Sequence, residues 1–497
     1  MGRFNPYVSL GGNFDKGAGA MKHLRALMIS AALVASTAVL PWHALAETTP
    51  AAAATPGDDI NTEGVTAYNA KNYIKAVTLF KQASDLGNPT ATFNLGYMYE
   101  NGFGVAKDVK QAAVLYRKAA DGGHNIAQNN LGTFYILGTG VPQDYKQAMY
   151  WYKKAADQGN AQSMYNVGSM YYSGQGVPVD YAQAMTWYQK AAAGGNLTAL
   201  NDIGTMYFEG TGVTQDYAQA LAWYKKAADK GLAIGQYDYG YMFVNGYGVA
   251  QDYAQGLLWY QKAADQGYDY AQNDLGLLYY NGLGAPKDLN KAAVWIRKAA
   301  DQGLARAQTS MGDLYISGLG VTQDYVQAMV WYRKAADQNS GEAANEIGNL
   351  YYNGNGVAKD DSQAATWYRR GADLGFAQAQ SSYGYMVENG AGGVTKDPAQ
   401  AMVWYKKAAD QGLAEAQSNI ALMYLNGVGV TADPAQACVW LQKAADGGYA
   451  FAAYALAVQY SSGNGVAQDW DKTRTYMQKA ADGGIEQAKD WLAKNPA

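Results

Sequence analysis

The stretch of residues 165–177, Tyr-Asn-Val-Gly-Ser-Met-Tyr-Tyr-Ser-Gly-Gln-Gly-Val, shows how one helix of this protein ends. Its apolar residues Val167, Met170 and Tyr171 recur at i, i+3 and i+4, which is the spacing of one helical face. Gly174 and Gly176 follow, and glycine readily adopts the left-handed conformation that ends a helix. The stretch therefore predicts the last turns of a helix and then a tight connection.

A second helix is predicted directly after this connection. Asp180 is followed three residues later by Gln183, which is a capping box. In that arrangement the carboxylate accepts from first-turn amides while the glutamine side chain reaches back to the cap. Helices of this kind also carry a tryptophan such as Trp151 and an alanine pair such as Ala155-Ala156. We expect the indoles to bury large areas while the alanines let neighbouring helices approach closely.

The helix pair repeats along the chain with a period of 36 residues. Gly64 opens a shorter first unit of 32 residues, and one residue is inserted near Ala391. Twelve units result, followed by a closing segment from Ile485 to Lys494. No unit can bury its apolar face alone, so stacking must supply the stability. The glycines that define the period are Gly96, Gly132, Gly168, Gly204, Gly240, Gly276, Gly312, Gly348 and Gly384.

Two short patterns in the second unit resemble a known family. Leu95-Gly96-x-x-Tyr99 and Ala112-x-x-x-Tyr116 match the tetratricopeptide pattern, with four residues added between the helices as Gly102-x-Gly104-Val105. This longer form resembles the Sel-one-like repeat (SLR) family; the first unit lacks the insertion and looks like an ordinary tetratricopeptide repeat. The resemblance implies an all-α, right-handed superhelical solenoid of about twelve antiparallel helix pairs with a C-terminal capping helix. It also implies an adaptor or scaffold role, in many relatives in the bacterial envelope.

The N-terminal part has the pattern of a secretory signal. Lys22 and Arg25 precede an apolar run over 26–40, and Ala44-Leu45-Ala46 follows, which predicts cleavage after Ala46. We therefore expect a periplasmic or secreted protein. The predicted organisation is an upstream extension over 1–20 with Met21 as the initiator, a signal peptide over 21–46, an Ala/Thr/Pro-rich linker over 47–61 and a repeat array over 62–497.

Composition excludes several classes of partner. The segment after Ala46 carries 34 basic and 41 acidic residues, and this net negative charge argues against nucleic acid. Nothing downstream of the signal has the 18 or so apolar residues that a membrane span needs. Cys438 is the only cysteine, so we expect neither a disulfide framework nor a lipid anchor.

Enzymatic chemistry is poorly supported by the sequence. His23 and His43 lie in the signal, which leaves His124 as the only histidine, so no Ser-His-Asp set and no His/Cys metal site can be assembled. We expect His124 to lie at a helix junction, Cys438 to be a small buried hydrophobe, and no cofactor to be bound. Some cysteine-rich relatives have been labelled β-lactamases, but the serine-enzyme motifs are missing here, and a hydrolase is a distant alternative.

A column of basic residues near the end of each second helix has two interpretations. It could form a track for an anionic polymer, although aspartates three residues further on, such as Asp121, Asp157 and Asp229, partly neutralise it. A basic residue in the last turn also suits the helix dipole, which favours a structural role. The column comprises Lys118, Lys154, Lys190, Lys226, Lys262, Lys298, Lys334, Arg370, Lys407, Lys443 and Lys479.

Function is expected where the repetition fails, on the first helix of each unit, which lines the concave wall in tetratricopeptide-like stacks. Tyrosines, amides and acids mix there, which suits an extended peptide or protein loop and suits a polysaccharide almost as well. The alternative is that these residues form an ordinary solvated helix face with no binding role. We predict first an envelope scaffold, with a regulatory role, for protein partners, and second a glycan-binding module in exopolysaccharide or peptidoglycan assembly. The candidate partner-binding residues are Tyr165, Asn166, Asn201, Asp202, Tyr237, Asp238, Tyr241, Asn273 and Asp274.

Overall fold

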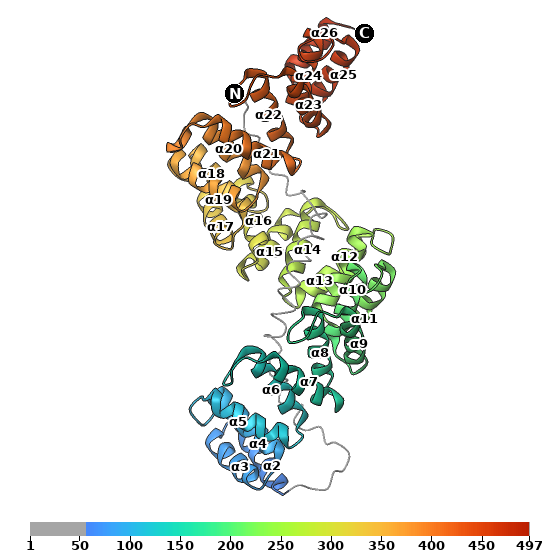
Figure 1. The fold of residues 1–497 in the computed structure, drawn as a ribbon, viewed down its shortest axis with the longest axis vertical. Helices are drawn as coiled ribbons and strands as arrows, with labels where there is room; N and C mark the ends of the chain where they lie inside the picture. The colour runs from blue at the N-terminus through green and yellow to red at the C-terminus, as the bar shows by residue number, and fades with distance from the viewer. Residues whose placement is uncertain (1–55, 497) are drawn as a thin grey trace. The chain divides into compact units, whose positions relative to one another are not determined.

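The computed structural model describes residues 56–496, and this part of the chain contains 25 α-helices and no strand. The predicted extension, signal peptide and most of the linker lie outside the described residues. The helices form the expected pairs, in which a first helix is followed by a second helix, and α26 (Glu486–Lys494) closes the array. The all-α repeat fold predicted from the sequence is confirmed (Figure 1).

The twelve first helices and twelve second helices alternate along the chain. The first helices are α2 (Asp58–Asn69), α4 (Pro89–Asn101), α6 (Asn125–Leu137), α8 (Ala161–Ser173), α10 (Leu197–Glu209), α12 (Ala233–Asn245), α14 (Asp269–Asn281), α16 (Ala305–Ser317), α18 (Gly341–Asn353), α20 (Ala377–Asn389), α22 (Ala414–Asn426) and α24 (Ala450–Ser462). The second helices are α3 (Tyr73–Asp85), α5 (Val109–Asp121), α7 (Tyr145–Asp157), α9 (Tyr181–Ala193), α11 (Tyr217–Asp229), α13 (Tyr253–Asp265), α15 (Leu289–Asp301), α17 (Tyr325–Asp337), α19 (Asp361–Asp373), α21 (Pro398–Asp410), α23 (Pro434–Asp446) and α25 (Trp470–Asp482).

The described chain divides between Gln266 and Gly267 into two compact units. We call them the N-terminal unit, α2–α13, and the C-terminal unit, α14–α26. Within each unit, every first helix packs against the second helix that follows it, and that second helix packs against the next first helix. Each unit is thus held together by contacts between elements that are close in sequence, as stacking requires.

Aspartate caps start the second helices, but only half of the predicted capping box forms. Oδ1 of Asp180 accepts from the backbone N–H of Gln183 at 2.9 Å. The N–H of Asp180 donates to the carbonyl of Tyr171 at 2.9 Å, so this donor is already satisfied without the glutamine side chain. All eleven aspartate-capped helices share this backbone bond back to the preceding first helix. The reciprocal glutamine bond was therefore a wrong expectation, because the connection between the helices already uses that donor.

The Gly-x-Gly connection requires glycine for two reasons. Gly174 and Gly176 have φ of 72° and 74°, in the left-handed region that side chains disfavour. A Cβ atom at Gly176 would also lie 2.7 Å from Cβ of Tyr145, the first residue of α7 in the preceding repeat. The connection thus lies against the start of the neighbouring second helix, and a side chain at its second glycine would push the two repeats apart.

The repeated glycine of the first helix faces a tyrosine of the second helix. A Cβ atom at Gly168 would lie 2.7 Å from Cδ1 of Tyr188, whose side chain is fully buried. The same close approach occurs between Gly132 and Tyr152. The 36-residue glycine period therefore exists because each of these first helices lies directly on a large side chain of the second helix, which is a tyrosine in most repeats and Ile296 opposite Gly276.

The two irregular units match their sequences. In the first unit, α2 begins at Asp58, four residues before the predicted start of the array, and only residues 70–72 separate it from α3. A Cβ atom at Gly64 would lie 2.6 Å from the Phe80 ring, so the same packing applies without the Gly-x-Gly insertion. The extra residue near Ala391 is taken up by a short 3-10 helix, Ala391–Gly393.

Candidate functional site

Eight of the nine predicted partner-binding residues are buried. Asp202 alone is half-buried. The rest are 8% exposed or less, namely Tyr165, Asn166, Asn201, Tyr237, Asp238, Tyr241, Asn273 and Asp274. The first helices do carry these side chains at equivalent positions, as predicted, but they are not an ordinary solvated helix face.

Two of these positions join neighbouring repeats. Tyr165 of α8 donates from its hydroxyl to Oδ2 of Asp202 in α10 at 2.9 Å. Asn201 of α10 donates from Nδ2 to Oδ2 of Asp238 in α12 at 3.0 Å. Both bonds link residues 37 positions apart. They connect the residue three before the repeated glycine with the residue two before it in the next repeat.

The same connection occurs elsewhere with other side chains. Oδ1 of Asn129 accepts from Nδ2 of Asn166 at 3.1 Å and from Oγ of Ser163 at 2.9 Å. Oγ of Ser382 donates to Oδ1 of Asn345 at 3.3 Å. These positions lie where the repetition of the sequence fails, and their side chains nevertheless form contacts between repeats. Their identities vary because each pair is matched across a repeat interface.

The tyrosines of α12 are also packed within the N-terminal unit. The ring of Tyr237 stacks on that of Tyr260, with centroids 5.1 Å apart and planes inclined by 19°. The ring of Tyr241 meets the edge of Phe208 at 6.2 Å and stacks on Tyr247 at 6.0 Å. These rings therefore contribute to the stability of the stack. Whether a partner touches them stays a prediction.

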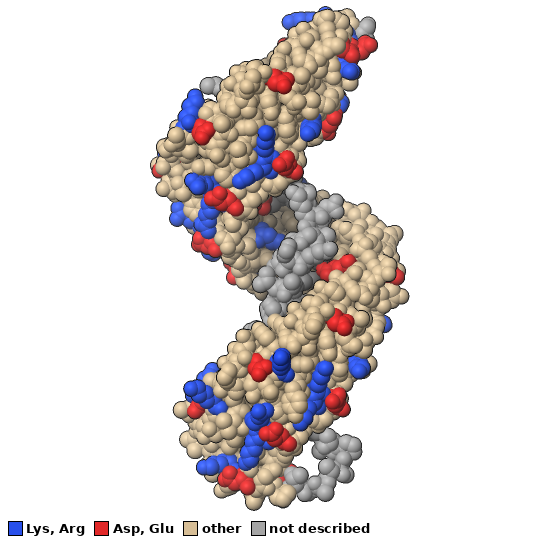
Figure 2. Space-filling view, in the orientation of Figure 1, with Lys and Arg blue, Asp and Glu red and all other residues tan. Residues whose placement is uncertain are grey.

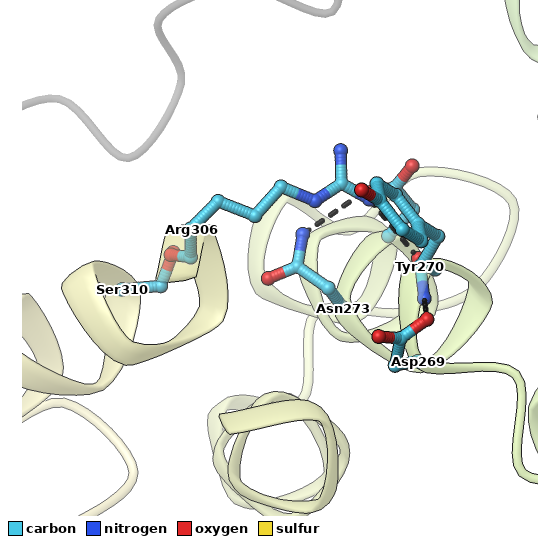
Figure 3. A network of polar contacts seen from close by, with 6 residues as sticks. Asp269, Tyr270, Asn273, Arg306 and Ser310 are labelled. Atoms are coloured by element: carbon cyan, nitrogen blue, oxygen red, sulfur yellow. Dashed lines mark hydrogen bonds and ion pairs between the residues drawn. The ribbon is translucent and has the colours of Figure 1, made fainter. Parts of the chain in front are cut away.

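A polar cluster in the C-terminal unit surrounds Arg306 of α16 (Figure 3). Nη2 of Arg306 lies 2.9 Å from Oδ1 of Asp274 and donates to the carbonyl oxygen of Tyr270 at 3.2 Å. The guanidinium carbon lies 4.6 Å from the centre of the Tyr270 ring, within cation–π range. Nδ2 of Asn273 donates to Asp274 at 2.9 Å. The first helices of this unit thus hold a guanidinium between a carboxylate and a tyrosine ring.

Charge is divided unequally between the two kinds of helix. In the N-terminal unit the first helices contain seven Asp and Glu and no Lys or Arg; in the C-terminal unit they contain seven Asp and Glu and a single basic residue, Arg306. The second helices contain 25 Lys and Arg against 13 Asp and Glu over the described residues. This excess of acids on the first helices was not predicted from the sequence. The total charge of the chain is near neutral, so it does not reveal that acidic residues prevail on the first helices and basic residues on the second helices.

The acids of α16 and α18 lie close enough to disturb one another. Burial raises the pKa of the Asp313 carboxyl well above its usual range, and the nearby carboxylates of Glu342 and Glu346 raise it further. The hydroxyl of Tyr332 donates to Oδ1 of Asp313 at 2.7 Å and opposes that rise. Burial also raises the pKa of Glu346. Ionisation of Asp313 and Glu346 is therefore disfavoured in the folded C-terminal unit.

The basic column of the second helices has a structural explanation that sequence analysis did not foresee. Nζ of Lys226 lies 3.6 Å from the centre of the Trp223 ring, three residues earlier on the same helix. Lys190, Lys262, Lys298, Lys334, Lys407 and Lys443 cover their tryptophans in the same way. Figure 2 shows rows of basic side chains with acidic ones beside them. Each ammonium thus covers an indole, as exposed cation–π pairs do.

The tryptophan column is less buried than expected. Trp151 and Trp331 are buried, whereas Trp187 and its equivalents in α11, α13, α15, α19, α21 and α23 are only half-buried. The large buried rings are instead the tyrosines one residue later, such as Tyr152 and Tyr188. The indoles lie at the edge of the core, where a lysine completes their cover.

Comparison with known proteins identifies the repeats. The family model described as the Sel1 repeat matches residues 69–88, 89–124, 125–160, 161–196, 197–232, 233–268, 269–304, 305–340, 341–376, 377–413, 414–449 and 450–485. The chain belongs to the Sel1 repeat family. None of the curated proteins compared with the chain matches it significantly.

Two solved Sel1-type structures resemble the chain. The first is c5321, described as a protective antigen of uropathogenic Escherichia coli strains with an SLR fold. It is 35% identical, and the match covers 85% of this chain and 91% of that one with a TM-score of 0.65. The second is a Sel1 repeat protein from Oxalobacter formigenes, 31% identical over 62% of this chain and 89% of its own, with a TM-score of 0.48. The first of these likenesses supports the repeat fold over most of the chain.

His124 and Cys438, the histidine and the cysteine of the described residues, both have structural roles in the Sel1 repeats. His124 is the N-cap of α6, where Nδ1 accepts from the N–H of Ala127 at 3.1 Å, and its ring stacks on Phe93 at 4.7 Å. Burial lowers the pKa of His124 to about 4, so the ring is neutral at physiological pH. Cys438 is 4% exposed, and burial raises the pKa of its thiol. The predicted roles of both residues, at a helix junction and in the core, are confirmed.

The described part of the chain lacks two kinds of feature. Over residues 56–496, no helix has the length and apolar character that crossing a membrane requires. The same range contains no group of three or more His, Cys, Asp or Glu side chains arranged to hold a metal ion.

Each first helix retains side chains that are exposed or half-buried. We call this surface, defined by the exposed and half-buried side chains of the first helices within one unit, the first-helix face. In the C-terminal unit it includes the exposed Glu342, the half-buried Gln378 and Tyr385, which is 41% exposed. In the N-terminal unit it includes the half-buried Asp202 and Glu209.

Proposed function

We propose that this Sel1 repeat protein is a non-catalytic scaffold that holds protein partners on its first-helix faces, in the bacterial cell envelope. The observation that carries the proposal is the direct bonding between neighbouring first helices, as in Tyr165 to Asp202. A row of helices joined side chain to side chain offers a surface that keeps its shape. Preorganisation of this kind reduces the entropy that a partner must lose on binding.

Export to the envelope rests on residues 21–46, whose basic start, apolar run and Ala-Leu-Ala site are those of a secretory signal. A regulatory role is the form of scaffolding that we favour, because the repeat surface can hold one partner and release it without chemistry. The export signal lies outside the described part of the chain.

The structure favours a protein partner over a glycan. A sugar ring commonly needs an open aromatic face to lie against, but Tyr165, Tyr237 and Tyr241 are packed against other rings or bonded between repeats. The amide and carboxylate groups that remain half-buried suit the N–H groups and basic side chains of a polypeptide.

Site-specific crosslinking tests this proposal. A photoreactive amino acid would replace Tyr385 on the first-helix face and, as a matched control, Val403, which is 44% exposed on the second helix α21. Irradiation in the producing cells should give protein adducts from position 385 and few from 403. Equal adducts from both positions, or adducts that a glycosidase removes, would contradict the proposal.

A further inference from the structure

We propose that the first-helix face of each unit binds an extended, positively charged segment of its protein partner, with Arg or Lys side chains directed at the acids of successive first helices. This inference rests on the proposed scaffold function and specifies the chemistry of the partner. Its first support is the charge division, in which the first helices carry 14 acids and one basic residue over the described chain.

The Arg306 cluster shows how this face holds a guanidinium. Arg306 pairs with Asp274 at 2.9 Å, lies 4.6 Å from the centre of the Tyr270 ring, and donates to a backbone carbonyl. It is the one basic side chain of the described first helices, and all three elements of its environment come from α14. Glu346 of α18 occupies the position of Asp274, and the residue equivalent to Arg306 in the next first helix is Gln378. A partner can supply there the cation that α16 supplies to Asp274.

Buried amide groups give an independent indication that a hydrogen-bond donor is missing from this face. Asn201 and Asn273 occupy equivalent positions on α10 and α14 and are 1% and 2% exposed. Each donates from Nδ2 to a carboxylate, yet Oδ1 of each has no hydrogen-bond partner. A buried acceptor left without a donor is destabilising, because it has lost its hydrogen bond to water and gained none in the protein. Both groups belong to the layer of acids, so this layer has an excess of acceptors.

The carboxyl groups of the C-terminal unit also support a cationic ligand. Asp313 and Glu346 lie on the successive first helices α16 and α18, and burial raises the pKa of both carboxyls; for Asp313 the nearby Glu342 and Glu346 raise it further. A nearby cation would relieve the repulsion among these groups. A cationic segment beside this face would favour the ionised forms that burial disfavours.

Spacing sets the expected form of the segment. Helices in contact lie about 8–10 Å apart, and an extended chain advances about 3.4 Å per residue. A basic residue at roughly every third position would therefore meet one first helix after another. The partner segment is expected to be extended and regularly basic.

Calorimetric titration of the full chain with the nine-residue peptide (Arg-Ala-Ala)3 tests the inference, with (Glu-Ala-Ala)3 as the reversed-charge peptide. The first-helix variants are Asp202→Asn with Glu209→Gln in the N-terminal unit and Glu342→Gln with Glu346→Gln in the C-terminal unit. The control, Asp265→Asn with Asp301→Asn, removes two exposed carboxylates from second helices. Circular dichroism melting of each variant verifies that it is folded.

We expect binding of the arginine peptide alone, weakened about tenfold when all four first-helix carboxylates are neutralised and changed less than twofold by the control. Arg306→Met should tighten binding because it removes the competing guanidinium. Equal weakening by the control, or equal binding of both peptides, would overturn the inference. Crosslinking from position 385 that persists despite such a result would retain the scaffold function and reject only the cationic segment; loss of both would reject both.

Discussion

The hydroxyl of Tyr165 lies 2.9 Å from Oδ2 of Asp202, which belongs to the next repeat, and the Tyr165 side chain is only 3% exposed. The bond ties α8 to α10, and the ring stacks on Tyr188 with centroids 5.4 Å apart. A residue that the sequence offers as a free binding anchor is thus part of a repeat interface.

Tyr165→Ala should consequently destabilise the N-terminal unit by about 3–5 kcal/mol, as loss of a buried aromatic ring usually does. Tyr165→Phe keeps the ring and loses only the hydrogen bond, at a cost of about 1–3 kcal/mol. Urea denaturation followed by circular dichroism measures both. If Tyr165→Ala left the midpoint unchanged, the ring would not have the packing role described above.

Gly240→Leu should open the stack locally. A Cβ atom at Gly240 would lie 2.9 Å from Cδ1 of Tyr260 and 3.1 Å from Cβ of Trp259, so a leucine must push α12 away from α13. Overpacking of this kind typically costs about 1–3 kcal/mol. Hydrogen exchange should rise in that repeat and its neighbours. A uniform loss of protection along the chain would contradict contacts limited to adjacent repeats.

Asp313→Asn should stabilise the C-terminal unit at neutral pH. The pKa of this buried carboxyl is raised in the folded state, so ionisation opposes folding as pH rises above the unfolded value of about 3.9. Asparagine keeps an oxygen for the Tyr332 hydroxyl and carries no charge. The urea midpoint of the variant should match that of the parent near pH 4 and exceed it increasingly towards pH 7.

A charge-neutralising change at an exposed site, Asp410→Asn on α21, is the matched control for that experiment. It should shift the midpoint little at either pH. A constant difference between Asp313→Asn and the parent from pH 4 to pH 7 would show that the carboxyl is not penalised by burial.

Export predicts a defined N-terminus. If residues 21–46 act as a secretory signal, the protein recovered from the periplasm or medium should begin at Glu47. Intact-mass measurement decides this directly. A full-length chain retained in the cytoplasm would contradict the predicted location.

Much of the fold follows from residues that repeat unchanged. The glycine column, the aspartate caps and the Gly-x-Gly connections predict the helix pairs because each has a local conformational cause, such as the positive φ of Gly174. The burial of Tyr165 could not be predicted in this way. Its partner Asp202 is 37 residues distant, and the pair varies to Asn201 with Asp238 one repeat later, so matched contacts resemble free variation.

The first and second helices also differ in burial and charge in ways that the residue types alone do not indicate. Tryptophan suggests a core position, but Trp223 is half-buried because Lys226 covers its ring at 3.6 Å. The acidic character of the first helices emerges only when each charge is assigned to its helix. Had the sequence been divided by helix before its charges were counted, the excess of acids would have been visible.

Carboxyl footprinting of the protein with its captured partner tests the central claim, that partners are held on the first-helix faces. A carbodiimide-coupled amine would label accessible carboxylates, and mass spectrometry would compare Glu342, Glu388 and Glu415 on first helices with Asp301, Asp373 and Asp446 on second helices. The account predicts that the partner reduces labelling of the first set and leaves the second set unchanged. Protection of the second set, with the first still labelled, would place the partner on the opposite helices and contradict it.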